Sequence, residues 1–166
     1  MLLLLAVLLH ECGHIVVLLF TGGKLKGVSF GLCGITLKAE YPPSYSSKLM
    51  ISLGGPLVGI LVFLLFRNAG KTLALFSEIN LWLSLFNLLP ISFLDGGSAI
   101  DSFFLLFLPY ESATALSHAI SLTTASLLWA FSVYLFLFLN GSASLFLLSL
   151  WFFFSLLYHN TAKRTE

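Results

Sequence analysis

The chain has 166 residues, of which 58% are hydrophobic and only 9% are charged, and its formal net charge at pH 7 is +1. Soluble globular domains carry about 25% charged residues, so this composition excludes an ordinary soluble domain and predicts a polytopic membrane protein. The sequence contains no basic patch, and we therefore expect no nucleic-acid partner.

The first predicted span, residues 2–21, is an apolar run that contains His10, Glu11 and His14. Two histidines four residues apart lie on one face of a helix, so both imidazoles can reach a single zinc ion. Glu11 lies beside them and could act as a general base toward water at the metal. Because ionisable side chains are expensive to bury in hydrocarbon, we predict a metal site at membrane depth rather than a chance match in a helix bundle.

The helical pattern disappears after this span, between residues 24 and 41. Glycines separate short alternating runs such as Val28-Ser29-Phe30 and Ile35-Thr36-Leu37-Lys38. This pattern predicts a small β-hairpin associated with the membrane, although a Gly-rich connecting loop would also fit. Pro42-Pro43 is expected to end the section, because neither residue continues a strand.

The second predicted span, residues 47–66, contains the sequence Gly54-Gly55-Pro56-Leu57-Val58-Gly59. Gly55 and Gly59 are four residues apart, a spacing that lets helix backbones approach closely. We therefore interpret these glycines as packing positions.

The third membrane segment, residues 73–108, is too long for one straight helix. Pro90 removes a helix donor and disfavours helical geometry at the preceding residue, and Gly96-Gly97 is expected to loosen the far end of the interruption. A break at membrane depth is tolerated only when it packs against protein or lines a wet cavity. We therefore predict a broken third helix whose break faces the metal site.

Two further spans are predicted at residues 113–139 and 143–158, joined by a turn at Asn140-Gly141. Six basic residues fall on one side of the resulting five-span arrangement and two on the other, which places the N-terminus outside and the C-terminus in the cytoplasm. The six are Lys24, Lys26, Lys38, Lys48, Lys163 and Arg164, and the two are Arg67 and Lys71.

A catalytic zinc ion usually has three protein ligands, and the histidine pair supplies two. The acidic candidates for the third, besides Glu11, are Glu40, Glu78, Asp95, Asp101, Glu111 and Glu166. Only Asp95 lies in the helix break with apolar flanks, so we predict it as the third ligand, with a helix N-cap as the alternative role. Two neutral imidazoles and one carboxylate leave a charge of +1 with zinc, which the ionised side chain of Glu11 can offset.

Three motifs together resemble the site-2 protease family of intramembrane zinc metalloproteases. They are HExxH at residues 10–14, a GGPxxG-like element at residues 54–59 and NLLPxxxLDGG at residues 87–97. The short form of the chain looks most like the bacterial sporulation branch, whose members process a membrane-tethered sigma-factor precursor. The resemblance covers roughly residues 1–108, the three-helix core of the family.

The resemblance implies that His10, His14 and Asp95 bind one Zn²⁺ per chain and that Glu11 is the catalytic acid and base. It also implies that Asn87 holds the substrate backbone or the developing oxyanion, although helix capping or an interhelix hydrogen bond would explain this residue as well. The predicted fold class is an all-α polytopic membrane protein of about five transmembrane helices, with a broken third helix and a small membrane-associated β-hairpin after the first. Residues 1–166 then form one integral-membrane peptidase domain, with a core at 1–108 and accessory helices at 109–166.

The predicted function is hydrolysis of a peptide bond in or near a transmembrane segment of a membrane-tethered regulatory protein. The expected partners are a membrane-anchored protein substrate, the lipid bilayer and a regulatory membrane protein, and the expected location is the cell membrane. Two alternatives remain at this point. A metal transporter would need ligands repeated along a path, whereas a non-catalytic scaffold would bind no zinc.

Overall fold

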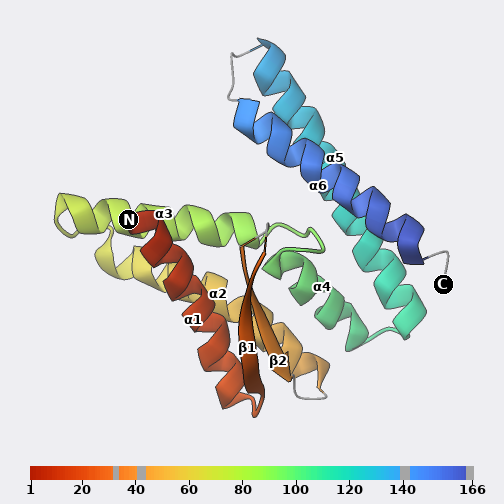
Figure 1. The fold of residues 1–166 in the computed structure, drawn as a ribbon, viewed down its shortest axis with the longest axis horizontal. Helices are drawn as coiled ribbons and strands as arrows, with labels where there is room; N and C mark the ends of the chain where they lie inside the picture. Colours follow the sequence, from red (N-terminus) through yellow and green to blue (C-terminus); the bar gives the residue numbers. More distant parts are fainter. Residues whose placement is uncertain (32–33, 41–43, 139–142, 164–166) are drawn as a thin grey trace.

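A computed structural model describes residues 1–31, 34–40, 44–138 and 143–163 of the chain. Its elements, in chain order, are α1 (Leu2–Phe20), β1 (Lys24–Gly31), β2 (Gly34–Glu40), α2 (Tyr45–Phe66), α3 (Lys71–Asn87), α4 (Asp95–Leu105), α5 (Tyr110–Phe138) and α6 (Ala143–Lys163). The helices α1 to α4 and the two strands lie together, and α5 and α6 run side by side away from them (Figure 1). The predicted helical fold class is confirmed. The expected break at Pro42-Pro43 and the expected turn at Asn140-Gly141 lie outside the described residues.

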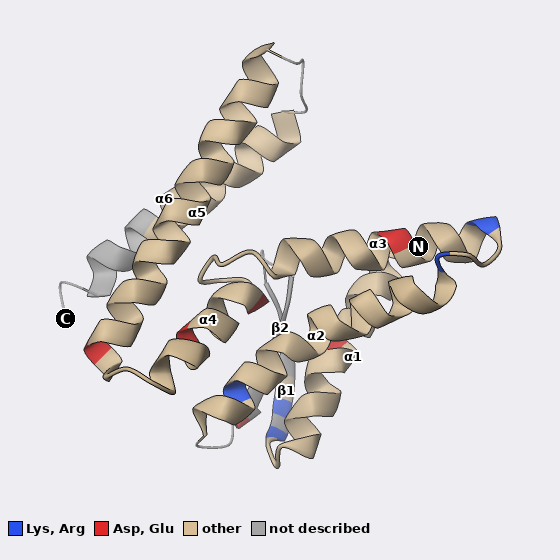
Figure 2. Ribbon diagram, turned by 180° about the vertical axis from the view of Figure 1, so that it is seen from behind, with Lys and Arg blue, Asp and Glu red and all other residues tan. Residues whose placement is uncertain are grey.

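Three of the described helices, α1, α2 and α5, are long and apolar enough to cross a membrane. Large apolar side chains such as Leu4, Leu65 and Phe138 are exposed along them, as expected for surfaces that face lipid. Charged residues are sparse, and long stretches of α2, α5 and α6 carry none (Figure 2). The chain is therefore a multi-pass membrane protein, whereas the number of five spans stays a prediction.

The two strands form an antiparallel sheet in which Lys24 pairs with Glu40 and Gly31 pairs with Gly34. The register shifts between Leu25 and Gly27, where one strand carries an extra residue. The pairing of residues 24–31 with 34–40 agrees with the strands that the alternating runs predict. Their association with the membrane stays a prediction.

Glycines set the distance between the first helices. A Cβ atom on Gly13 of α1 would lie 2.6 Å from the carbonyl oxygen of Gly54 in α2, so the two backbones are in direct contact there. Farther along α2, a Cβ atom on Gly59 would collide with the hydroxyl of Ser84 and lie 2.8 Å from the carbonyl oxygen of Asn80, both in α3. Close packing of the helices therefore explains Gly54 and Gly59, and the Cα atom of Gly55 belongs to the same contact with Gly13.

The predicted break in the third membrane segment is present between α3, which ends at Asn87, and α4, which begins at Asp95. Pro90 lies within this break, consistent with its missing N–H and its restriction on the preceding residue. The expectation that Gly96-Gly97 loosens the far end is wrong. Both glycines are buried within the first turn of α4, and the break folds back over them.

This close contact makes Gly97 sensitive to added volume. A Cβ atom at this position would collide with the carbonyl oxygen of Ile91 and lie 2.8 Å from the Cα atom of Ser92, and backbone atoms cannot rotate away. Gly97→Ala is expected to lower the stability of the folded chain by about 1–3 kcal/mol, the usual cost of overpacking. Thermal unfolding in detergent measures the effect. The control is Gly70→Ala, where a Cβ atom would meet nothing within 4 Å, and an equal loss in both variants would contradict the argument.

The break is also packed against the last two helices. Ile91 is fully buried in a cluster with Ala125 of α5 and with Phe152 and Leu156 of α6. Phe86, Leu89, Leu94 and Leu128 pack around this cluster. The helices α5 and α6 therefore support the break through apolar contacts.

Candidate metal centre

His10 and His14 lie one turn apart on α1, on the face that contacts α2. Both residues are buried, with 4% and 8% of their surface exposed. Their Nε2 atoms are 3.3 Å apart, and the rings meet edge to face with centroids 4.9 Å apart. The helical spacing of four residues thus directs both imidazoles toward one point.

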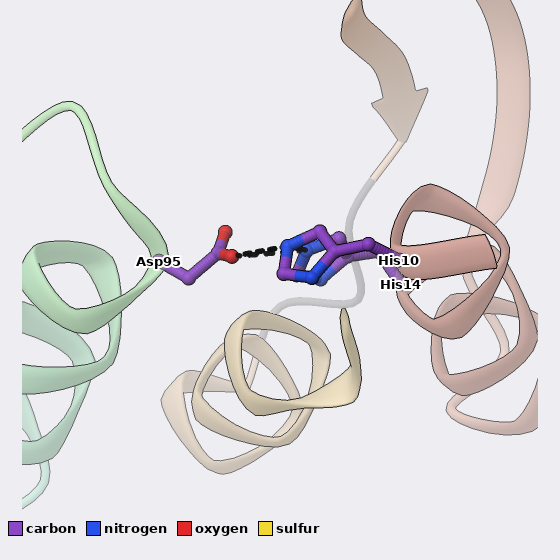
Figure 3. A group of neighbouring side chains, drawn as sticks. All are labelled: His10, His14 and Asp95. Carbon is purple, nitrogen blue, oxygen red and sulfur yellow. Dashed lines mark hydrogen bonds and ion pairs between the residues drawn. The ribbon is translucent and has the colours of Figure 1, made fainter. Parts of the chain in front are cut away.

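The carboxylate of Asp95 reaches the same point from α4, as Figure 3 shows. Its Oδ2 atom lies 2.9 Å from Nε2 of His10 and 3.2 Å from Nε2 of His14. Asp95 is the first residue of α4, a position that favours a negative charge because the N-terminus of a helix carries partial positive charge. The end of the break therefore places this carboxylate opposite the two imidazoles.

The three facing atoms fit a tetrahedral metal site. Zinc binds histidine nitrogen and carboxylate oxygen at about 2.0–2.2 Å, which separates neighbouring tetrahedral ligands by about 3.3–3.6 Å. The three separations observed here are 2.9, 3.2 and 3.3 Å, at or slightly below that range, so small outward shifts of the side chains would admit the ion. Among the residues that the structure describes, this is the group of three His, Cys, Asp or Glu side chains that could hold a metal ion.

A backbone group orients the second imidazole. Nδ1 of His14 lies 2.7 Å from the carbonyl oxygen of Ile51 in α2, and a carbonyl oxygen only accepts, so Nδ1 carries the proton and donates it. The N–H of Gly55 lies farther from the same Nδ1, at 3.4 Å, and cannot donate to a nitrogen that is itself protonated. Nε2 of His14 is therefore left with a lone pair directed at His10 and Asp95, as a metal ligand requires.

Gly55 lies directly against the cluster. A Cβ atom on this residue would collide with Nε2 of His14 and lie 2.7 Å from Nε2 of His10. The interpretation of Gly55 as a helix-packing position is incomplete: its Cα atom lies 3.0 Å from where a Cβ atom on Gly13 would be, and its open side lies against two imidazole rings. A side chain of any kind at this position would crowd the Nε2 atoms of both histidines.

The other two residues with predicted roles lie outside the group of three. Glu11 is half-buried next to His10 on α1, and its carboxylate is close enough to His10, His14 and Asp95 for charge–charge interactions. Nδ2 of Asn87 donates to the carbonyl oxygen of Leu83, 2.9 Å away, as a residue near the end of α3 can do. The structure therefore brings together His10, His14 and Asp95, with Glu11 at their edge and Asn87 bonded within its own helix.

The family model described as Peptidase M50B-like matches residues 1–96, which include both histidines and Asp95. The site-2 protease from Methanocaldococcus jannaschii has a similar structure, with a TM-score of 0.69 and 26% identity, over 93% of this chain and 74% of that one.

Two curated sequences are also similar. The chain is 32% identical over 114 residues to sll0528 of Synechocystis sp., a candidate zinc metalloprotease, an alignment that covers 61% of this chain and 30% of that protein. It is 34% identical over 135 residues to stage IV sporulation protein FB of Bacillus subtilis, over 76% of this chain and 47% of that protein. The chain thus spans less than half the length of either relative. The family model matches more than half of the chain, in agreement with the motifs at residues 10–14 and 87–97. The chain therefore belongs to the peptidase M50B-like family.

Proposed function

We propose that the chain is an intramembrane zinc metalloprotease that hydrolyses a peptide bond in or near a transmembrane segment of a membrane-tethered regulatory protein. The observation that carries the proposal is the meeting of two imidazoles and one carboxylate, from α1 and α4, within 3.3 Å of one another inside an apolar helical protein. Membership of a peptidase family supports it, as do the likeness to a solved site-2 protease and the relative described as a candidate zinc metalloprotease.

In this proposal His10, His14 and Asp95 hold one zinc ion per chain. When bound, zinc would supply a Lewis acid that polarises the scissile carbonyl group and makes a water molecule more acidic. The ligand set of two neutral imidazoles and one carboxylate keeps the net charge of the site low, which reduces the cost of holding it in a low-dielectric interior.

Glu11 and Asn87 are proposed to act on water and on the substrate. The carboxylate of Glu11 lies beside the ligands on α1, where it can take a proton from the attacking water and later donate it to the leaving amine. Nδ2 of Asn87 has two hydrogens, of which the bond to Leu83 uses one, so the other can donate to a substrate carbonyl or to a developing oxyanion.

Substrate is proposed to approach along the sheet. Each strand of the two-stranded sheet β1–β2 has one partner, so each has an outer edge that can accept a further strand. An unwound membrane segment presented in this way exposes its backbone to hydrolysis, which an intact helix does not. We further propose that the N-terminus lies outside the cell membrane and the C-terminus in the cytoplasm, and that a regulatory membrane protein is a partner of the chain.

A metal transporter is the second candidate from the sequence. Transport across the membrane needs successive binding sites, whereas the described part of the chain offers a single group of three ligands. A scaffold, in turn, has no need for three donor atoms aimed at one point. Both observations favour the protease.

Metal removal tests the proposal. The full chain, purified in detergent, is expected to contain about one zinc ion per molecule and, in vesicles, to cleave a co-reconstituted single-span regulator. A chelator should abolish cleavage, because without the zinc ion no Lewis acid remains in the site to activate water. Added zinc should restore cleavage. Zinc content by mass spectrometry and the cleaved fragment on a gel are the measurements. Cleavage that survives complete removal of zinc, or a purified chain that binds none, would contradict the proposal.

A further inference from the structure

The segment between α3 and α4 has to satisfy its backbone donors without a helix. The N–H of Leu89 donates to the carbonyl oxygen of Phe86 (3.2 Å), Pro90 has no N–H, and the N–H of Ile91 donates to the carbonyl oxygen of Leu89 (2.8 Å). These bonds stay within the segment and the last turn of α3. The next N–H, that of Ser92, instead donates to the hydroxyl oxygen of Ser121 in α5, 2.8 Å away.

Ser121 accepts two hydrogen bonds from the same residue. The hydroxyl of Ser92 also donates to the Ser121 oxygen, over 3.0 Å, so both lone pairs of that oxygen are directed at Ser92. Ser121 is 1% exposed, so its hydroxyl is enclosed by protein on the side of α5 that faces the break. Inside a membrane a lost partner for a backbone N–H is not made good by solvent, and the contact between Ser92 and Ser121 therefore fixes the break firmly to α5.

The position of Ser92 is transmitted to Asp95 over a short, tightly packed stretch. The N–H of Leu94 donates to the carbonyl oxygen of Ile91 over 2.8 Å, and Asp95 follows directly as the first residue of α4. In the first turn of α4, Gly97 lies against the backbone of Ile91 and Ser92, where no Cβ atom would fit. A displacement of the break therefore moves the start of α4 and the carboxylate that faces the histidines.

We propose that Ser121 is a positioning residue for the metal centre: by holding the backbone of Ser92, it keeps Asp95 within ligand distance of His10 and His14. The inference rests on the proposed function, since it assigns the residue a task toward the metal. Ser121 lies outside residues 1–96, the part that the family model matches, and its hydroxyl bonds Ser92, which is three residues before Asp95. The hydroxyl of Ser121 thereby adds a hydrogen-bonded contact to the apolar contacts through which α5 supports the break.

The test compares serine variants of the full chain for zinc affinity, by competition with a chelator, and for thermal stability. Ser121→Ala is expected to weaken zinc binding by about tenfold, the lower end of the range for residues that support metal ligands, and to lower cleavage in parallel. Ser92→Ala keeps the backbone bond and should have a smaller effect, and it does not change a buried position. Ser121→Thr retains the hydroxyl oxygen and should restore most of the affinity.

The matched control is Ser132→Ala, also in α5. Ser132 is buried and its hydroxyl bonds that of Ser149 in α6 over 2.6 Å, so this variant loses a comparable hydrogen bond away from the break. Weaker zinc binding in Ser121→Ala but not in Ser132→Ala supports the inference. Unchanged zinc affinity in Ser121→Ala, or equal losses of affinity and stability in both variants, would overturn it. Absence of zinc from the unaltered chain would overturn the proposed function itself, and this inference with it.

Discussion

Glu11→Gln is expected to abolish cleavage while the metal stays bound. The amide keeps the size of the side chain but cannot take a proton from water, and loss of a general base typically lowers a rate by about 10²–10⁴-fold. The three ligand atoms belong to other residues, so zinc content should remain near one per chain. Cleavage of a co-expressed single-span regulator and the zinc content of the purified variant are the two measurements.

The control for this experiment is Glu78→Gln, which removes an exposed carboxylate from α3. It should leave both cleavage and zinc content unchanged. Full cleavage by Glu11→Gln would show that another group moves the proton, and loss of zinc from that variant would place Glu11 among the ligands.

Gly55→Ala is expected to expel the metal and with it all activity. The added methyl group would collide with Nε2 of His14 and crowd Nε2 of His10, and both atoms belong to rings held between α1 and α2. Alanine is also about 1 kcal/mol more favourable than glycine inside a helix, so the helix α2 itself should not be weakened. We expect the purified variant to be folded, with zinc content close to zero.

Gly59→Ala is the matched control because it lies one turn farther along the same helix. Its methyl group would collide with the hydroxyl of Ser84 and not with the histidines. This variant should lose stability but retain zinc. If Gly55→Ala retained zinc as well, the ligand arrangement drawn in Figure 3 would not be that of the metal-bound chain.

The parts of the site that could be predicted from sequence are those with a local periodic or chemical signature. The spacing of His10 and His14 predicts a shared face because a helix turns every 3.6 residues. Pro90 predicts a break, since it cannot donate to a helix. Asp95 stands out because it is an acidic residue at the end of that break with apolar neighbours. The structure places all three side chains of the predicted ligand set together.

Other features lack such a signature. The carbonyl oxygen of Ile51, which orients His14, belongs to the backbone. Any residue type at this position would supply the same acceptor, so the sequence does not indicate it. Gly55 looks like any helix-packing glycine in sequence, and only the structure shows the two imidazole rings against it. Ser121 resembles the many serines that bond their own helix, and only the tertiary structure brings it to Ser92.

The same limit explains the one wrong expectation about the break. Glycine pairs are read as flexible because the backbone of glycine has more freedom than that of other residues. At Gly96-Gly97 the lack of a side chain serves a different purpose, which is to let the carbonyl groups of Leu88 and Ile91 lie against α4. Sequence alone does not distinguish freedom from close contact.

Asp95 follows His10 by 85 positions in the chain, so the ribosome makes the histidine pair well before the carboxylate. A nascent chain that has inserted only α1 and α2 already carries both imidazoles, but the carboxylate is still to be made, and Ser121 comes later still. The three-residue ligand group is therefore completed only once α4 has been synthesised, and a nascent chain that has inserted α1 and α2 alone cannot form it.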